Sequence, residues 1–415
     1  MRIARWLLES ERQPAMTQLP AHASVIANAS VWMESEAIDQ LHRVAALPFC
    51  VRAVGMPDLH PGRGVPIGAA FVFSGRVLPD LVGGDAGCGV LVLAGHKEGP
   101  RGDALERRVL AAWDDPVLPD VDPEELLLAA WQGGPRALSW LREVPEALAE
   151  LARQFADDEA PSGAFPLERA HALQLGTIGG GNHFAEISRV DRIADRARAR
   201  ALGLFRDAQV VLVHTGSRAL GAALHARYAG ATLEGGAIEA YLADLRGAVR
   251  YARTNRLLAA WRMARAAGLG TASRIARMFD IVHNAVEPRA DGAFLHRKGA
   301  APAERDQPTV VLGSRGTPSW VVQGLGNDAC LCSVAHGAGR RMARSDAHAK
   351  LKERYTRASL ARTGLGGRVI CDDASLMYEE HPDAYKPIEP VVESLEQAAS
   401  AARVASLVPL ITVKK

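Results

Sequence analysis

The alternation of apolar and polar residues divides the chain into blocks with different predicted secondary structure. Between residues 48 and 95, short apolar runs such as AAFVFSG and GVLVLAG alternate with glycine-rich turns. Short apolar runs bounded by turn residues are typical of strands, so this block predicts strands that are joined tightly. The segment LVGGDAGCGV, residues 81 to 90, is expected to form a turn between two of these strands and contains Asp85 and Cys88.

The block from about residue 100 to 170 has a different pattern. It is acidic, rich in Leu and Ala, and interrupted by Pro and Gly, as in DPEELLLAAWQGGPRALSWL. Apolar residues at helical spacing with such interruptions favour short amphipathic helices. Few of its residues have catalytic potential, so we expect a peripheral helical insertion.

The rest of the chain returns to short strands around one long helical stretch. Strands are predicted within 174–187 and 208–221, and residues 237–267 have apolar positions at the i, i+3, i+4 spacing of one or two long helices. More short strands follow to about residue 335, then a basic helix near 337–360 and a closing strand over 404–415. Since no repeat or low-complexity linker occurs, the pattern predicts one mixed α/β (α+β) domain over residues 21–415, after a loosely attached N-terminal extension, residues 1–20.

Composition is that of a soluble protein. Of the 415 residues, 48% are hydrophobic and 23% are charged, which is ordinary for a globular enzyme. No uncharged apolar run reaches the roughly 18 residues of a membrane span, and the N-terminus lacks the features of a signal peptide, so we expect a cytoplasmic protein. The formal charge of +2 neither requires nor excludes a nucleic-acid partner, because only a local basic patch would matter.

The five cysteines are an odd number, widely spread, and include no CxxC pair. This distribution predicts reduced thiols and argues against a disulfide framework or a four-cysteine zinc site.

Histidines recur in polar or glycine-flanked segments at predicted strand ends. A single such histidine is more often a structural residue bonded to a neighbouring carbonyl group. The repeated setting changes that balance, because glycine lets the backbone approach a ligand and imidazole supplies a metal-binding or nucleophilic nitrogen. The five candidates are His183, His214, His283, His296 and His336.

Together with Asp85 and Cys88, these histidines would offer oxygen, sulfur and nitrogen ligands. That mixture suits a transition metal better than Mg²⁺, with Zn²⁺ as the first choice and Mn²⁺ as the second. The segments GGGN and HGAG could hold phosphates with backbone N–H groups. Because the chain has neither a GxxxxGK[ST] loop nor a KxDG motif, histidine would be the expected nucleophile if the protein transfers a nucleotide.

Taken together, these motifs resemble those of the RtcB family of RNA ligases. They occur in the family's order from about residue 50 to the end, and several are long. The matching segments are GMPDLHPGRGVPIGAA (55–70), VGGDAGCG (82–89), LGTIGGGNHFAEI (175–187), HTGSR (214–218), HNAVE (283–287), HRKGA (296–300), GSRGTPSW (313–320), GLGN, CSVAHGAGRRMAR (332–344), AYKPI (384–388) and the terminal VKK.

The resemblance implies a ligase that uses GTP and Mn²⁺ to join RNA 3′-phosphate or 2′,3′-cyclic phosphate ends to 5′-hydroxyl ends. It places a guanylylated nucleophile at His336. It also implies two manganese ions instead of zinc, with Cys88 near both, and with the ligands Asp85, Cys88, His183, His214 and His283.

The same resemblance implies a set of guanylate contacts, in which Glu186 and Lys414 would meet the edge of guanine. RNA phosphates would meet Arg218, Arg340 and Arg341, although each of these could equally be a solvated surface charge. The implied guanylate contacts are Asn182, His183, Phe184, Ala185, Glu186, His283, Asn284, Leu312, Gly313, Ser314, Arg315, Ser319, His336, Gly337, Ala338, Gly339 and Lys414.

The chain departs from the family pattern in three places. It has LGSRGT where PGSMGT is expected, HRKGAA where HRKGAT is expected, and two terminal lysines instead of Lys-Gly. None of these changes removes a metal ligand or the nucleophile. They suggest a divergent branch, such as the one associated with release factor H, and Arg315 leaves the nucleotide preference open.

Two other functions remain open at this stage. One is a metal-dependent phosphodiesterase or cyclic phosphatase without guanylylation, although the intact HGAGR segment around His336 favours the ligase. The other is a non-enzymatic RNA-binding protein, which the low aromatic content of 5% disfavours. The expected partners are tRNA halves or damaged RNA, with the need for an archease-like activator undecided, and we expect a monomer.

Overall fold

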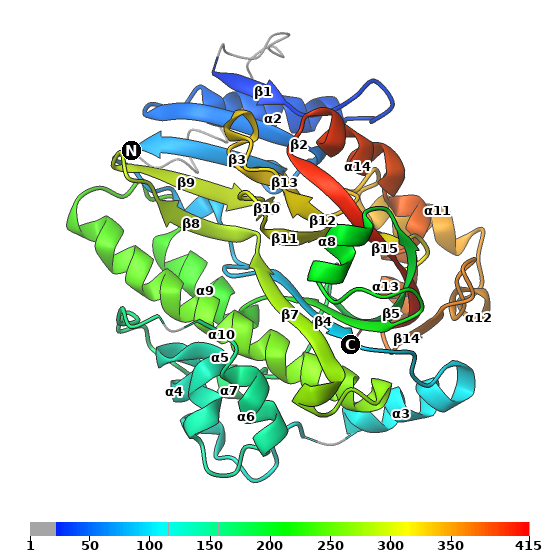
Figure 1. Ribbon diagram of the computed structural model, residues 1–415. Helices are drawn as coiled ribbons and strands as arrows, with labels where there is room; N and C mark the ends of the chain where they lie inside the picture. The colour runs from blue at the N-terminus through cyan, green and yellow to red at the C-terminus, as the bar shows by residue number, and fades with distance from the viewer. Residues whose placement is uncertain (1–21, 115, 157, 415) are drawn as a thin grey trace.

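A mostly antiparallel sheet of eight strands contains most of the strands that border the candidate ligands (Figure 1). In spatial order the strands are β11 (Pro308–Val311), β12 (Ser319–Gly324), β15 (Ala401–Lys414), β5 (Phe184–Ile193), β6 (Gln209–Thr215), β4 (Gly89–Gly95) and β7 (Ile275–Val282), with β14 (Arg368–Cys371) paired in parallel with β15. Strand β4, which lies between β6 and the edge strand β7, is buried along its whole length, which explains why GVLVLAG is apolar without alternation.

A second sheet of five strands lies above the first in Figure 1. Its order is β1 (Ala23–Val25), β2 (Cys50–His60), β3 (Ile67–Ser74), β9 (Ala293–Lys298) and β8 (Asn284–Pro288). A short antiparallel pair, β10 (Ala300–Pro302) and β13 (Ser333–Ala335), completes the strands. The mixed α+β fold is therefore as predicted.

The computed structural model describes residues 22–114, 116–156 and 158–414. The predicted N-terminal extension and the final Lys415 lie outside these residues. Within the described part, no helix combines the length and the apolar composition that a membrane span requires.

The long helical stretch is a single helix, α10 (Gly236–Ala267), which ends where Gly268 adopts the left-handed conformation with φ of 78°. It packs on β4 and β6 with one side and on the short helices of the predicted helical block with the other (Figure 1). Those helices are α3 (Gly102–Asp114), α4 (Pro123–Gln132), α5 (Gly134–Ala137), α6 (Glu146–Ala152) and α7 (Arg169–Ala172).

The start of α4 shows how local sequence sets a helix boundary. The carboxylate of Asp122 accepts hydrogen bonds from the backbone N–H groups of Glu124 and Glu125, and Pro123 occupies the first turn. The buried face of α4 includes Leu127 and Trp131, which join the same apolar core as α10.

The basic helix predicted near 337–360 is shorter than expected, so that prediction is wrong in extent. Residues 337–343 are not helical, since Gly339 has a φ of 75° and Arg340 forms a bridge with Tyr385. Helix α11 (Arg344–Lys352) begins after them, and α12 (Arg357–Leu360) follows a break. These helices share a small core of their own with α13 (Ala374–Glu379).

The remaining helices are α2 (Ser35–Ala45), α8 (Arg196–Ala201), α9 (Arg218–Tyr228) and α14 (Ile388–Gln397). Of these, α2, α8 and α14 pack on strands of the two sheets, and α9 packs on α10. Short 3-10 helices are η2 (Pro79–Leu81), η3 (Leu138–Trp140), η4 (Ala272–Arg274), η5 (Asp328–Cys330) and η6 (Pro382–Ala384).

Candidate active site

Four neighbouring strands of the eight-stranded sheet bring the predicted metal ligands to one edge. Gly89, the first residue of β4, pairs with the last residues of β6 and β7, and the first residue of β5 pairs with His214. Residues next to these strand ends must therefore lie together, although they are far apart in sequence. The ligands are Asp85 and Cys88 before β4, His183 before β5, His214 near the end of β6 and His283 after β7.

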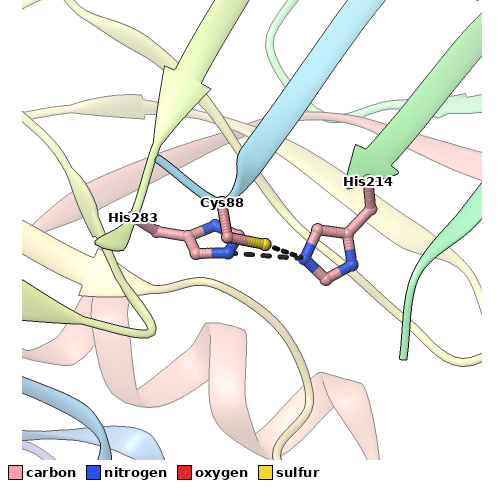
Figure 2. Close-up of side chains that lie close together, drawn as sticks. All are labelled: Cys88, His214 and His283. Carbon is pink, nitrogen blue, oxygen red and sulfur yellow. Dashed lines mark hydrogen bonds between the residues drawn. The ribbon is translucent and has the colours of Figure 1, made fainter. Parts of the chain in front are cut away.

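Cys88 is the centre of this group. Its Sγ atom lies 3.4 Å from Nε2 of His183 and 3.4 Å from Nε2 of His214. His214 Nε2 is in turn 3.3 Å from Nε2 of His283, and Figure 2 shows the side chains of Cys88, His214 and His283 pointing toward one another. On the other side, His183 Nε2 is 2.8 Å from Asp85 Oδ2.

These atoms form two possible metal-binding triads that share Cys88. One consists of Cys88, His214 and His283, and the other of Asp85, Cys88 and His183. Sulfur, nitrogen and oxygen donors in this arrangement fit a divalent transition metal, and the shared thiol fits two ions close together. The prediction that Asp85 and Cys88 reach the same site from one turn agrees with this geometry.

Burial sets the protonation of the ligands. It lowers the pKa of His214 and of His283 well below the ordinary value, and the neighbouring imidazoles lower it further, so both rings are neutral and their nitrogen lone pairs are available. Burial, with the Asp85 carboxylate beside it, raises the pKa of the Cys88 thiol well above its usual range. A metal ion would therefore have to displace the thiol proton when it binds.

Asp85 behaves differently from the other buried ligands. Burial acts to raise its pKa, but the adjacent His183 ring outweighs this effect and lowers the pKa to about 2. Its position also depends on Gly216, because a Cβ atom there would lie 2.0 Å from Asp85 Oδ1. The glycine of the HTGSR segment is thus required for the close approach of the carboxylate.

A buried arginine is hydrogen-bonded to the backbone of two segments that carry metal ligands. Arg256 of α10 is fully buried and pairs with both carboxylate oxygens of Asp280 at 2.6 and 2.9 Å. Its Nη1 donates to the carbonyl groups of Gly87 and Thr215, the residues adjacent to Cys88 and His214 in sequence. Arg256 is a positioning residue that sequence reasoning missed, since it occurs in an ordinary helical pattern.

His336 lies beside this ligand group, directly after β13. Its ring centroid is 4.8 Å from that of His283 and 6.4 Å from that of His214. Its Nδ1 is 2.7 Å from Oδ2 of Asp58, whose side chain is fully buried. With Nδ1 facing the carboxylate, Nε2 is the nitrogen available for attack.

A cavity of about 510 Å³ opens in front of His336. It brings together most of the predicted guanylate contacts, which come from the segments 182–186, 312–315 and 336–339 and from the end of β15. The members that line it are Asn182, Phe184, Glu186, Leu312, Gly313, Ser314, Arg315, His336, Gly337, Ala338, Gly339 and Lys414.

Five predicted guanylate contacts lie behind the cavity wall instead. Asn284, for example, donates to the Asp85 carbonyl and accepts from the N–H of Gly299, and Ser319 accepts from the N–H of Gly313. None of the five is among the described residues that line the cavity, so any contact of theirs with a nucleotide stays a prediction. The five are His183, Ala185, His283, Asn284 and Ser319.

The two predicted guanine contacts are buried and already hydrogen-bonded. Glu186 accepts from Ser188 and Thr412, and burial raises its pKa to about 7 although both bonds act to lower it. Lys414 Nζ donates to the carbonyl groups of Gly181 and His183. These bonds fix both side chains at the cavity.

The three predicted RNA-binding arginines differ in how far their guanidinium groups are already held by contacts within the protein. Arg340 donates to Met342, Glu380, Tyr385 and Glu379, so its guanidinium is bound within the protein. Arg218 packs tightly on the glycine loop, because a Cβ atom at Gly179 would lie 1.4 Å from its Nη1 atom. The Nε atom of Arg218 is buried and has no hydrogen-bond partner among the described residues. Arg341 is exposed at the cavity rim.

Several residues at or behind the cavity escaped the sequence reasoning. Asp58 could have been noticed, because it is the acidic residue of the quoted segment GMPDLHPG. Glu380 could not, since only the fold places its carboxylate 3.0 Å from Arg340 Nη1 and 3.8 Å from Lys414 Nζ. The exposed rim is basic on balance, with Arg63, Arg341, Arg344 and Lys350 against the acidic Glu34 and Asp346. His296, a candidate by context, is a structural residue that accepts from the N–H of Leu78.

Comparison with known proteins agrees with the motif resemblance. The sequence model of the family described as tRNA-splicing ligase RtcB matches residues 40–415. RNA-splicing ligase RtcB2 of Escherichia coli is 39% identical over 94% of this chain and 94% of its own length. RNA-splicing ligase RtcB of Mycobacterium tuberculosis is 32% identical over 90% of this chain and 100% of its own, and tRNA-splicing ligase RtcB of Archaeoglobus fulgidus is 28% identical over 98% and 96%. The chain belongs to the RtcB family of RNA ligases.

Proposed function

From this membership, we propose that the protein joins RNA ends carrying a 3′-phosphate or 2′,3′-cyclic phosphate to 5′-hydroxyl ends, with GTP as co-substrate and Mn²⁺ as cofactor. The observation that supports this most directly is the position of His336. Its ring lies between the metal-ligating group and a cavity that has room for a nucleotide, with its centroid 4.8 Å from that of His283. A buried histidine that faces both is placed for transfer of a nucleotide.

In the proposed first step, Nε2 of His336 attacks the α-phosphorus of GTP. The N–P bond forms as the bond from the α-phosphorus to the bridging oxygen breaks, and pyrophosphate leaves. Asp58 faces Nδ1 at 2.7 Å and stabilises the positive charge that the ring acquires. Two Mn²⁺ ions, held by Asp85, Cys88, His183, His214 and His283, would neutralise charge on the phosphates.

In the proposed second and third steps, RNA takes over the guanylate. An oxygen of the RNA 3′-phosphate attacks the guanylate phosphorus and releases His336. The 5′-hydroxyl oxygen then attacks the activated 3′-phosphate, which forms the phosphodiester and expels GMP. A cyclic phosphate must first be opened by water, and the exposed basic rim with Arg341 and Arg344 would attract the RNA backbone.

We also propose that the catalytic unit extends over residues 21–415, with α3 to α7 peripheral to the reaction. No residue between 100 and 180 is among the described residues that line the cavity. The predicted cytoplasmic location, the monomeric state, the role in tRNA splicing or RNA repair and any archease-like activator are further parts of this proposal.

Labelling with GTP tests the proposed function. Wild-type protein incubated with α-³²P-GTP and MnCl₂ should retain acid-labile, base-stable label, and His336→Ala should retain none. A hydrolase that had lost guanylylation would open a 2′,3′-cyclic phosphate without GTP and give no joined RNA. Absence of label with every divalent metal would exclude the ligase mechanism.

A further inference from the structure

A second cavity, of about 400 Å³, lies beside the active-site cavity and has no role in the proposed reaction. We call it the Trp32 groove. Its lining includes Val31, Trp32, Arg341, Lys386, Pro387 and Pro390. The groove lies between the segment that joins β1 to α2 and the start of α14, and Figure 1 shows α2 and α14 on the same side of the molecule.

Trp32 is unusual among the aromatic residues of the described chain. Its side chain is 53% exposed, whereas most of the other aromatic residues are at least partly buried. Phe49, Trp140 and Phe205 are also exposed, but they line neither of the two cavities. A tryptophan exposed in a concave site offers its ring face to a ligand.

The groove borders the active-site cavity. Arg341 lines both cavities, and the wall between them is built from two paired segments. The N–H of Arg341 donates to the Ala384 carbonyl, and the N–H of Lys386 donates to the Gly339 carbonyl, each at 2.9 Å. Gly339, three residues after His336, faces the active-site cavity. A chain that passes over this wall would therefore run from the groove to the nucleophile.

The charges of the groove favour an anionic ligand. Arg341 uses its Nε to donate to the Asp383 carbonyl, and its exposed guanidinium makes no other hydrogen bond or ion pair within the described part of the chain. Lys386 also lines the groove, but it is buried and its Nζ donates to the carbonyl groups of Pro57 and Leu59 on either side of Asp58, so Arg341 supplies the accessible positive charge. No acidic residue is among the described residues that line the groove.

We propose that the Trp32 groove binds an unpaired nucleotide of the RNA strand that leads into the active site. The base stacks on the Trp32 ring and a neighbouring phosphate pairs with Arg341. This inference rests on the proposed function, because it takes RNA as the substrate. Stacking on an aromatic ring requires a base outside a duplex and tolerates any base, so the groove selects single-stranded ends without reading their sequence.

Binding of a fluorescein-labelled, unstructured RNA oligonucleotide with a 3′-phosphate, measured by anisotropy without GTP, tests the inference. Trp32→Ala should raise Kd about 5- to 150-fold, the range expected for loss of one base–aromatic stack. Trp32→Phe keeps a ring and should stay close to wild type. Trp140→Ala is the matched control, since that residue is 70% exposed and lines neither cavity, and its Kd should be unchanged.

Salt dependence separates the two contacts. Arg341→Gln should reduce the slope of log K against log salt by about one, because one phosphate contact is lost. Trp32→Ala should leave the slope unchanged. A 2-aminopurine placed along the oligonucleotide should be quenched by wild type at one position and not by Trp32→Ala.

Equal RNA affinity of Trp32→Ala and wild type would overturn the proposal. An equal loss of RNA affinity in Trp32→Ala and Trp32→Phe would also overturn it. Self-association that depends on Trp32, seen by sedimentation of the protein alone, would assign the groove to a second copy. GTP labelling of the same variants keeps the two proposals apart. If wild type takes no label but RNA binding still depends on Trp32, the groove stands and the ligase mechanism falls.

Discussion

Two buried polar groups lie next to each other at the edge of the eight-stranded sheet, and they differ in how their atoms are satisfied. The Arg256–Asp280 pair is closed, since both carboxylate oxygens and the Nε, Nη1 and Nη2 atoms of the arginine have partners. The ligand group is open. Its thiol and imidazole nitrogens face one another, and Nδ1 of His183 and of His214 have no hydrogen-bond partner in the described structure.

This difference distinguishes buried polar groups that stabilise the fold from buried polar groups that bind a ligand. A buried charge whose hydrogen bonds are all made holds the fold together, whereas sulfur, nitrogen and oxygen atoms of several side chains that converge on one another indicate a set of metal ligands. The two groups are also connected, because Arg256 binds the carbonyl groups next to Cys88 and His214. The closed pair positions the open group.

The largest effect is expected from Cys88→Ala, which removes the atom shared by the two triads. Guanylylation with labelled GTP should fall by at least about 10³-fold, since charge stabilisation by metal contributes several kcal/mol. Bound Mn²⁺, counted by equilibrium dialysis, should fall with it, while the free energy of unfolding of the metal-free protein changes by about 1 kcal/mol or less. Cys330→Ala is the control, because that thiol is buried outside the ligand group. Full guanylylation by Cys88→Ala would contradict the assignment of the open group.

Arg256→Met should affect stability instead. It leaves the buried Asp280 carboxylate with only the partly exposed Arg253, whose Nε lies 3.2 Å from Oδ2, so the free energy of unfolding in urea should fall by about 3 kcal/mol. Adding Asp280→Asn removes that charge and should recover part of the loss. If the two substitutions destabilise additively, the pair is not coupled and the comparison fails.

The smallest effect concerns pH and Glu186. Its folded pKa of about 7 lies above the ordinary value of 4.5, because burial disfavours the ionised form. The folded state therefore holds the proton more tightly, and the stability present below about pH 4.5 is lost as pH rises through 7, by about 3 kcal/mol at most. Unfolding midpoints measured from pH 4.5 to 8 should show this decline in wild type and a flatter profile in Glu186→Gln. Identical profiles would show that burial of this carboxylate has no such cost.

The pattern of the sequence predicted secondary structure well where local rules are strong. The strand around GVLVLAG, the long helix and the short helices after residue 100 all follow from apolar spacing and turn residues. The helix near 337–360 was overextended because the basic and alanine residues after Gly339 favour a helix, whereas Gly337 and Gly339 do not. The left-handed conformation of Gly339 and the bridges of Gly337 with Leu312 and of Arg340 with Tyr385 replace helix at residues 337–343, and the Arg340–Tyr385 contact spans 45 residues.

The sequence by itself determined the family and the chemical character of the site, because motifs such as GGDAGCG, GGGNHF and HGAGR specify ligand types and flexible backbone within a few residues. Tertiary structure alone decided which of these residues meet. Antiparallel pairing of β5, β6, β4 and β7 brings four strand ends to one edge, and Asp58 reaches His336 across 278 residues of chain. Spacing along the chain contains no information about such contacts, since they depend on sheet register and on the packing of α10. The same reason explains why Arg256, Glu380 and Trp32 became visible only in the fold.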